Sequence, residues 1–372
     1  MVIDATTGPT MMGAVRVAYT LEQCWHRVPG GTAVAAIETA REIRLGHPDV
    51  ELVGVAGAHG DEPAAPWRPP IAVRPLRAGH GATLYARWLL TGRPEVEQAT
   101  GRVDVAHATS IIPCPTRAPL VSTIHDLAFL HEPEHFTHWG RLLFTRSVRV
   151  LRHRAALVLC SSTATMDDCV QAGLPADRLR LVPLGVRSPS ATPEEIARVR
   201  SAHRLPARYL LFVGTIEPRK NLVRLAEAVN RLADPIELVV VGSAGWGDAA
   251  PVASDRLRFL GFVPSADLGP LYAGASAACY PSIREGFGLP VLEAMAQGTP
   301  VVTSRGTATE EAAGGAAVLV DPHDVDDIAA GIERALYDDG GLVDAGRARA
   351  AEMTWARTAT LTVGAYRDAA SR

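Results

Sequence analysis

The sequence predicts an α/β protein made of two successive domains, each built on a parallel sheet of the Rossmann type. Short apolar, β-branched runs alternate with longer segments of helical periodicity almost throughout the chain, a rhythm typical of βαβ units. The 372 residues are too many for one ordinary core and suit two domains of roughly 150–200 residues each. The rhythm breaks once, over 187–205, and then restarts.

The expected elements follow that rhythm in both halves. In the first half, helices such as 32–44 lie between expected strands at 15–19, 51–56, 71–75, 103–106, 121–125 and 157–161. In the second half, helices at 221–232, 267–275 and 289–297 lie among expected strands at 208–214, 237–242, 256–261, 277–282, 300–304 and 317–321. Ligand sites favour domain interfaces and the carboxyl ends of parallel strands, so we expect the site in a cleft between the two domains.

The break predicts where the domains divide. SPSATPEE opens with turn residues and offers Thr192 or Ser190 as the N-cap of a short helix. We expect an N-terminal domain over 13–186, a linker over 187–205 and a C-terminal domain over 206–350. Residues 351–372 are expected to form a C-terminal helix that can pack back on the N-terminal domain.

Charge and cysteine content argue against several classes of protein. The formal net charge is -3, whereas proteins that bind duplex nucleic acid carry a marked basic excess, so we expect no nucleic-acid partner. The five cysteines are scattered and never form a CxxC pair, which favours reduced thiols in a cytoplasmic protein over disulfides or a zinc site. The first dozen residues lack the features of a signal peptide, and no stretch approaches the ~20 apolar residues of a membrane span.

The most informative segment is PSIREGFGLPVLEAMAQGTP, over 281–300. Glu285 precedes a Gly-Phe-Gly turn, Pro290 can begin a helix, and Glu293 is expected in the first turn of that helix. The glycines leave backbone N–H groups open to a ligand, and a helix N-terminus favours anionic oxygens. Two carboxylates therefore flank a loop suited to a phosphorylated, hydroxyl-rich molecule. Taken alone, a glycine turn before a buried helix is an equally good interpretation.

The pattern ExGFGLPxxEAMAxGxPVV resembles the nucleotide-sugar site of glycosyltransferase family 4. The segments 258–268 and 271–282, and Asp321-Pro322, resemble in order the neighbours of that site. The resemblance implies a GT-B fold, with two Rossmann-like domains facing a cleft, and a retaining transferase that needs no metal. It places Glu293 at the ribose and Glu285 at the donor-sugar hydroxyls. The other donor contacts that it implies here are Phe262, Val263, Gly286, Phe287, Gly288 and Leu289.

A second cluster, GTIEPRKN, follows an expected strand. Arg219 and Lys220 lie where a loop enters a helix, so guanidinium, ammonium and helix dipole can converge on a phosphate. The resemblance implies that this positive pair holds the donor's diphosphate and stabilises the leaving group, with Gly214 and Thr215 beside it. In the commoner family pattern an arginine follows the glycine directly, whereas this chain has Thr215 there. The EPRKN form occurs in a branch that includes mannosyltransferases; without that context a solvated basic loop explains the cluster equally well.

Two features of the first half complete the expected site. Pro29-Gly30-Gly31 puts a flexible turn before a helix and resembles the family's glycine loop, which faces the donor phosphate and the acceptor. His125-Asp126 ends an expected strand and resembles a histidine thought to contact the transferred sugar, although a lone histidine at a strand end is more often structural. The strand and turn that close this domain in the family resemble residues 181–186. The residues expected on the acceptor side are Trp25, His26 and Asp126.

Three other patterns are weaker. The HEPEH run from His131 to His135 satisfies HExxH, but Pro133 disfavours the continuous helix that this zinc motif needs, so we expect a surface loop. The glycines over 242–247 lack the full GxGxxG order of a dinucleotide-binding loop. Asp324, in the run Asp-Val-Asp, is expected to cap a helix over 325–335 rather than to bind a metal.

The segment from Arg141 to Arg154 carries five arginines and no acid. Its apolar positions predict a helix packed on the first domain with the basic residues outward, and a solvated face is the plainer interpretation. The alternative is a patch for anionic lipid or a lipid-diphosphate acceptor, which would bring peripheral contact with an anionic membrane.

We therefore expect a retaining hexosyltransferase that uses a nucleotide-sugar co-substrate and no other cofactor. The EPRKN and HDL variants favour GDP-mannose as donor, with UDP-hexoses as the alternative, and the acceptor can be a lipid-linked saccharide, a growing polysaccharide or a small metabolite. Rival functions on the same architecture are a phosphorylase and a nucleotide-sugar epimerase. A sugar-nucleotide-binding protein without turnover is a further rival, against which the intact Glu285, Glu293, Lys220 and His125 argue.

Overall fold

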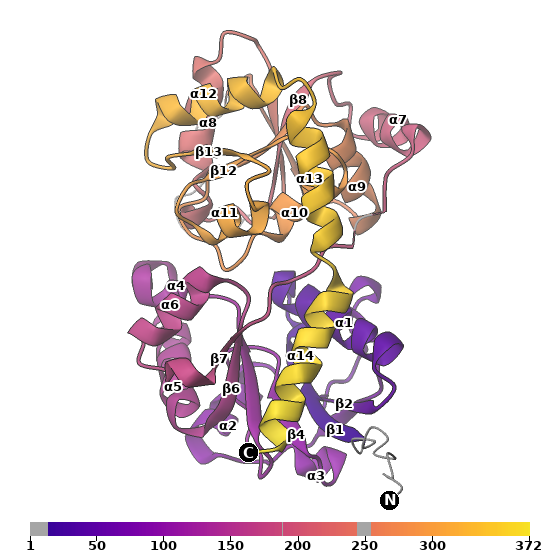
Figure 1. Cartoon of the computed structure of the whole chain (residues 1–372), viewed down its shortest axis with the longest axis vertical. Coiled ribbons are helices and arrows are strands. Elements are labelled where there is room, and N and C mark those ends of the chain that lie inside the picture. Colours follow the sequence, from indigo (N-terminus) through magenta and orange to yellow (C-terminus); the bar gives the residue numbers. More distant parts are fainter. Residues whose placement is uncertain (1–13, 188, 244–253) are drawn as a thin grey trace, which may run out of the picture.

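The computed structural model describes residues 14–187, 189–243 and 254–372 of the chain. Two halves are stacked along the long axis of the molecule, and each half contains a parallel sheet with helices around it (Figure 1). The predicted architecture of two Rossmann-like domains is confirmed.

The N-terminal sheet has seven strands in the order β3-β2-β1-β4-β5-β6-β7, and all of its paired strands run parallel. Its inner strands β1, β4 and β6 are largely apolar runs buried on both faces, as parallel sheets covered by helices require. The order reverses between β1 and β4, which makes their carboxyl ends a switch point where ligand sites form. The strands are β1 Val15–Thr20, β2 Val50–Gly57, β3 Val73–Leu76, β4 Val105–Ala108, β5 Leu120–Ile124, β6 Ala155–Cys160 and β7 Leu179–Leu181.

The C-terminal sheet has six strands in the order β10-β9-β8-β11-β12-β13, again parallel. Its order reverses between β8 and β11, which places a second switch point in this half. The strands are β8 Tyr209–Val213, β9 Glu237–Val241, β10 Leu257–Gly261, β11 Ala277–Tyr280, β12 Val301–Ser304 and β13 Val318–Val320.

Helices and short 3-10 turns connect the strands in both halves. In the N-terminal half they are η1 Glu22–Trp25, α1 Gly30–Gly46, η2 Ala65–Trp67, α2 Ala82–Thr91, α3 Glu97–Thr100, α4 Ala128–His131, η3 Pro133–His135, α5 His138–Arg154, α6 Thr163–Gln171 and η4 Ala176–Arg178. In the rest of the chain they are α7 Pro193–Ala202, η5 Pro218–Lys220, α8 Leu222–Arg231, α9 Ser265–Gly274, α10 Leu289–Ala296, α11 Ala308–Ala313, α12 Val325–Leu336, α13 Gly341–Glu352 and α14 Trp355–Ala370.

Every strand and helix expected from the sequence overlaps an observed element, although one strand overlaps at a single residue. Residues 181–186 were expected as a strand and turn, but β7 ends at Leu181 and no strand follows before the next helix among the described residues. Pro183 lacks the backbone N–H that a ladder would need, which explains why the strand does not continue.

The last helix, α14, lies against the N-terminal half although it follows the C-terminal sheet in sequence (Figure 1). Val363 and Tyr366 of α14 are fully buried against Val17 and Val105 of the N-terminal sheet. The two chain crossings between the halves lie side by side, because the backbone N–H of Val186 donates to the carbonyl of Met353 at 2.8 Å. This double crossing holds the two sheets in one arrangement.

The segment expected as a linker, 187–205, contains helix α7. Thr192 caps it as expected, in a capping box with Glu195: the Thr192 hydroxyl accepts from the Glu195 backbone at 3.3 Å. Val199 and Leu205 are buried in the core of the C-terminal half, so this helix packs with that half. The domain boundaries stay predictions.

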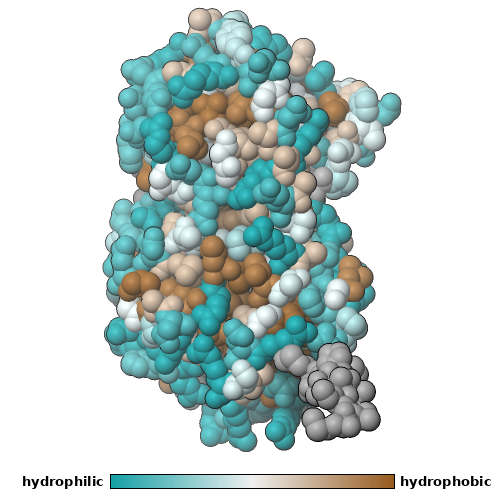
Figure 2. All heavy atoms as spheres, viewed as in Figure 1, coloured by the Kyte–Doolittle hydropathy of each residue, from teal (hydrophilic) through white to brown (hydrophobic). Residues whose placement is uncertain are grey.

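The surface is mostly hydrophilic, with apolar residues showing in both halves on the face drawn in Figure 2. Within the described part of the chain, no helix combines the length and the apolar character that crossing a lipid bilayer would take. All five cysteines are buried and unpaired.

Candidate active site

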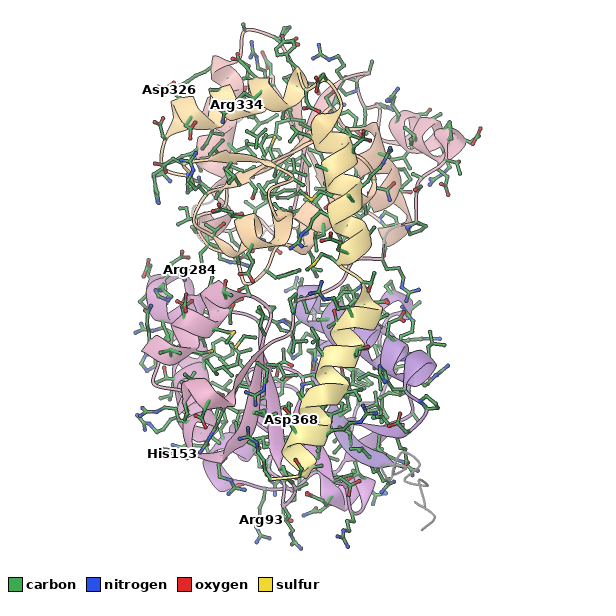
Figure 3. The ribbon with its side chains drawn as sticks, in the orientation of Figure 1. Arg93, His153, Arg284, Asp326, Arg334 and Asp368 are labelled. Carbon is green, nitrogen blue, oxygen red and sulfur yellow. The ribbon has the colours of Figure 1, made fainter. Side chains whose placement is uncertain are left out.

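Loops from the two halves meet where strands of both sheets end. His125 directly follows β5 in the N-terminal half, and the segment 281–288 follows β11 in the C-terminal half. A Cβ atom added to Gly286 would lie 2.2 Å from the carbonyl oxygen of His125, so only glycine permits this approach of the two backbones. Arg284 lies at the same boundary between the halves (Figure 3).

Four charged side chains of the C-terminal half form what we term the ionic cluster: Glu217, Arg219, Lys220 and Glu285. The ammonium of Lys220 donates to Oε1 of Glu285 at 2.6 Å, and Nη1 of Arg219 donates to Oε2 of the same carboxylate at 2.8 Å. Nε of Arg219 donates to Glu217 at 2.8 Å. Two cations and two carboxylates therefore balance one another in a largely buried position.

The environment of the ionic cluster fixes its charge states. Burial alone would raise the pKa of Glu285, but the adjacent Lys220 and Arg219 outweigh burial and lower this pKa to about 2. Burial works against the charge on Arg219, but Glu285 and Glu217 outweigh it and raise the Arg219 pKa. For Glu217, burial prevails over the attraction of both cations and raises its pKa. Glu285 is thus ionised throughout the neutral range.

Asn221 explains how the cationic loop is held. It adopts a left-handed backbone conformation, with φ of 60°, which asparagine tolerates better than most residues. Its side-chain amide donates to the carbonyl of Pro281 at 2.8 Å and to that of Pro322 at 2.6 Å. The sequence analysis named this residue as the end of a motif and the start of a helix and gave it no role in the site, yet it ties together three segments that surround the cluster.

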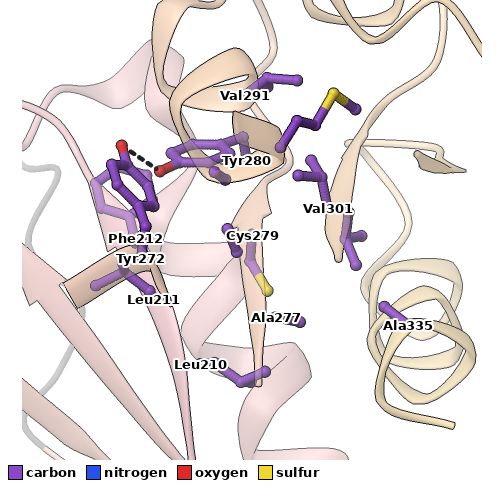
Figure 4. Close-up of a cluster of buried hydrophobic side chains, with 14 of the residues drawn as sticks. Leu210, Leu211, Phe212, Tyr272, Ala277, Cys279, Tyr280, Val291, Val301 and Ala335 are labelled. Carbon is purple, nitrogen blue, oxygen red and sulfur yellow. Dashed lines mark hydrogen bonds between the residues drawn. The ribbon is translucent and has the colours of Figure 1, made fainter. Parts of the chain in front are cut away.

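Glu293 lies further along the helix than expected. Helix α10 begins at Leu289, so Glu293 falls one turn in rather than in the first turn, which corrects the prediction. The hydroxyl of Tyr272 donates to Glu293 at 3.0 Å, and the hydroxyl of Tyr280 donates to Tyr272 at 3.1 Å (Figure 4). Burial raises the pKa of Glu293. The two tyrosines belong to the buried apolar core of the C-terminal half, which also contains Cys279 and Val291.

Hydroxyl groups of the N-terminal half bind the glycine turn across the boundary. The hydroxyls of Ser161 and Ser162 donate to the carbonyl of Gly286 at 3.0 and 2.9 Å. Thr165 donates to the carbonyl of His125 at 3.0 Å, so the same group of hydroxyls contacts both backbones. These side chains hold the two halves together at the point where Gly286 meets His125.

Two charged contacts lie beside this one. Nη1 of Arg284 is 3.0 Å from Asp168 on α6, and Nε2 of His131 is 2.8 Å from the other oxygen of that carboxylate. Thr163, at the start of α6, donates its backbone N–H to Glu311 of α11 at 2.8 Å. Helix α6 is therefore the main contact of the N-terminal half with the glycine-rich loop and with α11.

His125 is held neutral. Burial lowers its pKa to about 4, although Asp126 acts in the opposite direction, and its Nε2 is buried without a hydrogen-bond partner among the described residues. His125, Asp126 and Arg219 line one cavity of about 220 Å³, which we term the phenylalanine cavity because Phe129, Phe136 and Phe144 line it as well. The cavity thus joins side chains from both halves.

The N-terminal glycines also approach the C-terminal half. Helix α1 begins at Gly30, two residues earlier than expected, so Gly30 and Gly31 form its first turn rather than a loop before it. Leu289 at the start of α10 lies 3.8 Å from the position of a Cβ on Gly31. The two segments therefore approach each other across the boundary, while the role of Gly30 and Gly31 toward the donor stays a prediction.

The remaining expected contacts differ in exposure. Phe262 is 77 % exposed just beyond β10, whereas Val263 and Phe287 are buried in the core. Gly214 and Thr215 follow β8, and Lys220 passes close to Gly214, since its Cε lies 3.6 Å from the position of a Cβ there. Gly288 has a φ of 124°, which favours glycine at the entry to α10.

Trp25 and His26 belong to a separate cluster of the N-terminal half. Trp25 stacks on His59 with ring centroids 4.6 Å apart, and His26 lies 3.0 Å from the hydroxyl of Tyr85. Beneath them the buried Glu22 accepts from the backbone of Gly57 at 2.7 Å. No interaction of the described residues joins this cluster to the ionic cluster, so the acceptor-side assignment of Trp25 and His26 stays a prediction.

The three weaker sequence patterns are the HEPEH run, the glycines over 242–247 and the capping residue Asp324. The helix breaks between His131 and Pro133, which confirms that HEPEH is not a zinc-binding helix, but two short helical turns replace the expected surface loop. Asp324 caps α12 as predicted, accepting from the Asp326 backbone at 2.9 Å. Residues 244–247 of the glycine run lie outside the described residues. Gly242 packs tightly, because a Cβ there would lie 2.0 Å from the Gly214 carbonyl.

Helix α5 carries the five arginines on exposed positions, as expected. Arg146 also donates to the carbonyl of Leu89 at 2.7 Å, and Trp139 is 74 % exposed on the same helix. Membrane contact through this helix stays a prediction. Among the residues that the structure describes, no group of three or more His, Cys, Asp or Glu could hold a metal ion.

One signal in the sequence could have strengthened the prediction that Lys220 binds the diphosphate. Lys220 is the only lysine among the 37 lysines and arginines of the chain. A chain that otherwise uses arginine for every cation has a compact ammonium at the centre of its ionic cluster. Glu217, which was quoted in the motif but given no role, completes that cluster and also went unrecognised.

Comparisons with known proteins bear on both halves. A family model described as "Glycosyltransferase Family 4" matches residues 29–188, and one described as "Glycosyl transferases group 1" matches residues 207–338. The O-antigen chain mannosyltransferase B of Escherichia coli is 35% identical over 267 residues, which cover 66% of this chain and 70% of that protein. The MMP alpha-(1->4)-mannosyltransferase of Mycolicibacterium hassiacum is 35% identical over 239 residues, or 60% of this chain and 56% of that protein.

A solved structure shares the arrangement of both halves. HepE of Anabaena, crystallised in complex with UDP and glucose, superposes with a TM-score of 0.72 at 20% sequence identity. The superposition covers 94% of this chain and 98% of that one. At this level of identity the likeness shows the fold.

Proposed function

Because the chain belongs to glycosyltransferase family 4, we propose that it transfers mannose from GDP-mannose to a hydroxyl of a saccharide acceptor, with retention of the anomeric configuration. The observation that carries this proposal is the ionic cluster. It sets an ammonium and a guanidinium on the two oxygens of one buried carboxylate, beside a glycine-rich turn at a helix start. Such a site is suited to a diphosphate next to a hydroxyl-rich sugar.

In the proposed complex Lys220 and Arg219 bind the diphosphate and stabilise the charge that develops as it leaves. Their charge is already fixed in place by Glu285 and Glu217, so little reorganisation accompanies the reaction. This preorganised pair takes the part that a metal ion plays in other transferases. Glu285 then faces the sugar hydroxyls and Glu293 the ribose, while the exposed Phe262 is available to the nucleotide base.

The proposed reaction proceeds on one face of the sugar. The acceptor oxygen forms a bond to the anomeric carbon as the bond to the β-phosphate oxygen breaks, and the acceptor proton passes to that leaving oxygen. His125 is neutral and lines the phenylalanine cavity together with Arg219, a position from which it can donate to or accept from the transferred sugar. Detection of a glycosyl-enzyme adduct, or of an inverted product, would count against this course.

Mannose is favoured by the relatives rather than by the geometry. Two relatives at 35% identity are named mannosyltransferases, whereas the solved structure with the same fold holds UDP and glucose. A UDP-hexose is therefore the alternative donor.

The first experiment is a thermal-shift screen of the whole chain with GDP, UDP, ADP and dTDP, without added metal. GDP at about 100 times its Kd should stabilise the protein by about 2.7 kcal/mol, and Lys220→Ala should abolish that shift. Lys220→Arg should fail as well, because a planar fork cannot replace a compact ammonium against Gly214. Arg231→Ala, which removes an exposed cation paired with Asp326, is the matched control and should shift like the wild type.

The same preparation separates the rival functions. Transfer of mannose from GDP-mannose to an acceptor supports the proposal. Turnover that requires inorganic phosphate would indicate a phosphorylase, and a changed sugar still bound to its nucleotide would indicate an epimerase. Stabilisation by a nucleotide other than GDP would replace the donor, and stabilisation by none would overturn the proposal.

A further inference from the structure

The phenylalanine cavity has a composition that the transfer of a plain sugar does not need. Phe129, Phe136 and Phe144 form one wall, and Ile111 and Ala128 add further apolar surface. The three rings contact one another edge-to-face or tilted, with centroids of Phe129 and Phe144 5.4 Å apart and those of Phe136 and Phe144 6.2 Å apart. This is a built aromatic wall, because Phe129 is buried in the core and fixes the other two rings.

The other lining residues of the cavity are polar. Three of them, His125, Asp126 and Arg219, belong to the proposed reaction site, and Arg219 also binds Glu285. Thr32 and Ser110 complete the polar lining. A molecule filling the cavity would therefore meet both the reacting groups and three phenylalanines, and an amphiphilic ligand matches this mixed lining.

The desolvation of hydroxyl groups argues against a purely saccharide occupant. A hydroxyl that faced the three rings would lose water without finding a partner on them, at a cost of roughly 1–3 kcal/mol for each such group. An apolar group suffers no such loss and gains from leaving water. The cavity of about 220 Å³ exceeds the engineered apolar cavity of about 150 Å³ that holds benzene, so it has room for a group larger than a six-membered ring.

We propose that the phenylalanine cavity binds an apolar aglycone carried by the saccharide acceptor, next to the sugar that receives the new bond. The inference rests on the proposed function, which supplies the donor, and it adds the chemical class of the acceptor. The cavity then selects acceptors by the alkyl or aryl group attached to them, and the polar rim orients the accepting hydroxyl toward His125 and Arg219.

The test compares octyl α-mannoside with methyl α-mannoside, both below the micellar concentration of the octyl compound. Binding to the full chain in the presence of GDP is measured by equilibrium dialysis of the labelled glycosides. The octyl glycoside should bind at least tenfold more tightly than the methyl glycoside. Equal affinities would overturn the proposal.

Two variants alter the cavity in opposite ways. Phe144→Ala removes part of the aromatic wall, and Ile111→Trp fills the space from a loop position that is only half-buried. Each should reduce the preference for the octyl glycoside to less than threefold and leave the binding of the methyl glycoside within about twofold. Phe144→Ala shortens a side chain that lines the cavity, whereas Ile111→Trp enlarges one. If one variant fails to fold, the other still tests the cavity, and the melting temperature of each shows whether it is folded.

Leu142→Ala is the matched control, because Leu142 is an apolar residue 52 % exposed on α5, the helix that carries Phe144, and does not line the cavity. It should keep the full preference, and an equal loss in this variant would assign the effect to the outer surface and overturn the proposal. Transfer from GDP-mannose and UDP-glucose is measured on the same samples. Selective octyl binding without any transfer would overturn the proposed function alone, whereas transfer with equal affinities would overturn the cavity assignment alone.

Discussion

On the C-terminal side of the boundary the site is ionic, with Lys220 and Arg219 within 2.8 Å of one carboxylate. The N-terminal side, which we term the neutral side, has Asp126 in the cavity lining but otherwise presents uncharged groups there: burial keeps His125 and His107 uncharged, hydroxyls contact the glycine turn, and phenylalanines line the cavity. The two sides suit different ligands. A charged ligand is recognised by opposite charges fixed before it arrives, whereas a ligand that brings little charge is recognised by shape, hydroxyls and aromatic surface.

The two sides also differ in how their charges are secured. Every member of the ionic cluster has a partner of opposite charge, so none is left buried and unpaired. In the neutral side, Nε2 of His125 is buried without a partner among the described residues. An unpaired buried ring nitrogen is costly in the free protein, and it marks a place where a ligand can supply the missing contact.

Gly286→Ala is the change with the largest expected effect, because Gly286 lies where the ionic side and the neutral side are in contact. The new methyl group would lie 2.2 Å from the His125 carbonyl and would force the two halves apart. A misplacement of about 1 Å can reduce a rate by about 100-fold, so transfer should fall by that order while the affinity for GDP stays within about twofold. Steady-state transfer and GDP titration measure the two effects separately.

Gly364→Ala on α14 is the control, since nothing lies within 4 Å of a Cβ at that position. It should leave the transfer rate unchanged. Wild-type transfer by Gly286→Ala would show that the ionic and neutral sides act as two independent sites, without this close contact.

The ionic side could be predicted from the sequence because its residues are close together in the chain. Arg219 and Lys220 are adjacent, and Glu285 and Glu293 lie in one segment with the glycines that shape it. Their resemblance to a known family covered nearly the whole domain. Even so, the pairing of Glu285 with both cations was not foreseen, since it joins residues 65 positions apart in the chain.

The neutral side was harder to predict for a physical reason. The wall of the phenylalanine cavity comes from the turn after β5 and from α5, and its rings meet through tertiary packing that no local pattern records. His107 was not singled out at all, because a lone histidine in a buried strand carries no signal. The contact of Ser161 and Ser162 with Gly286 crosses between halves and depends on how the two sheets are stacked.

The neutrality of the N-terminal side predicts a loss of stability in mild acid. Burial and the neighbouring His125 lower the pKa of His107 to about 3, from its ordinary value of 6.5. Below pH 6.5 His107 becomes protonated in the unfolded chain but stays neutral in the folded chain. The contribution of His107 to the free energy of unfolding is therefore present above pH 6.5 and is lost as pH falls. Between pH 6.5 and 5 the loss is about 2 kcal/mol for this residue. Urea unfolding at several pH values measures it.

His107→Asn isolates that contribution, since its amide can take the place of Nδ1 toward Tyr366 but does not titrate. The variant should lose about 2 kcal/mol less than the wild type over the same interval. The difference between the two curves is the quantity to compare, because Glu217 and Glu293 have raised pKa values and act in the opposite direction. Parallel curves would mean that His107 is charged in the folded protein.

The smallest expected effect tests the balance of the ionic side. Glu285 is ionised at all working pH values and neutralises part of the charge of Lys220 and Arg219. Glu285→Gln removes that charge but keeps the shape, so the two cations should attract a diphosphate more strongly and the Kd for GDP should fall by roughly three- to tenfold. Isothermal titration with GDP measures it.

Asp326→Asn changes the net charge of the chain by the same amount at an exposed position and should leave the Kd for GDP unchanged. Comparing the two variants separates the local effect of the carboxylate from the field of the whole protein. A weaker affinity for GDP in Glu285→Gln would mean that the carboxylate serves chiefly to hold Lys220 and Arg219 in place. The ionic side would then resemble the neutral side, with geometry rather than charge deciding what binds.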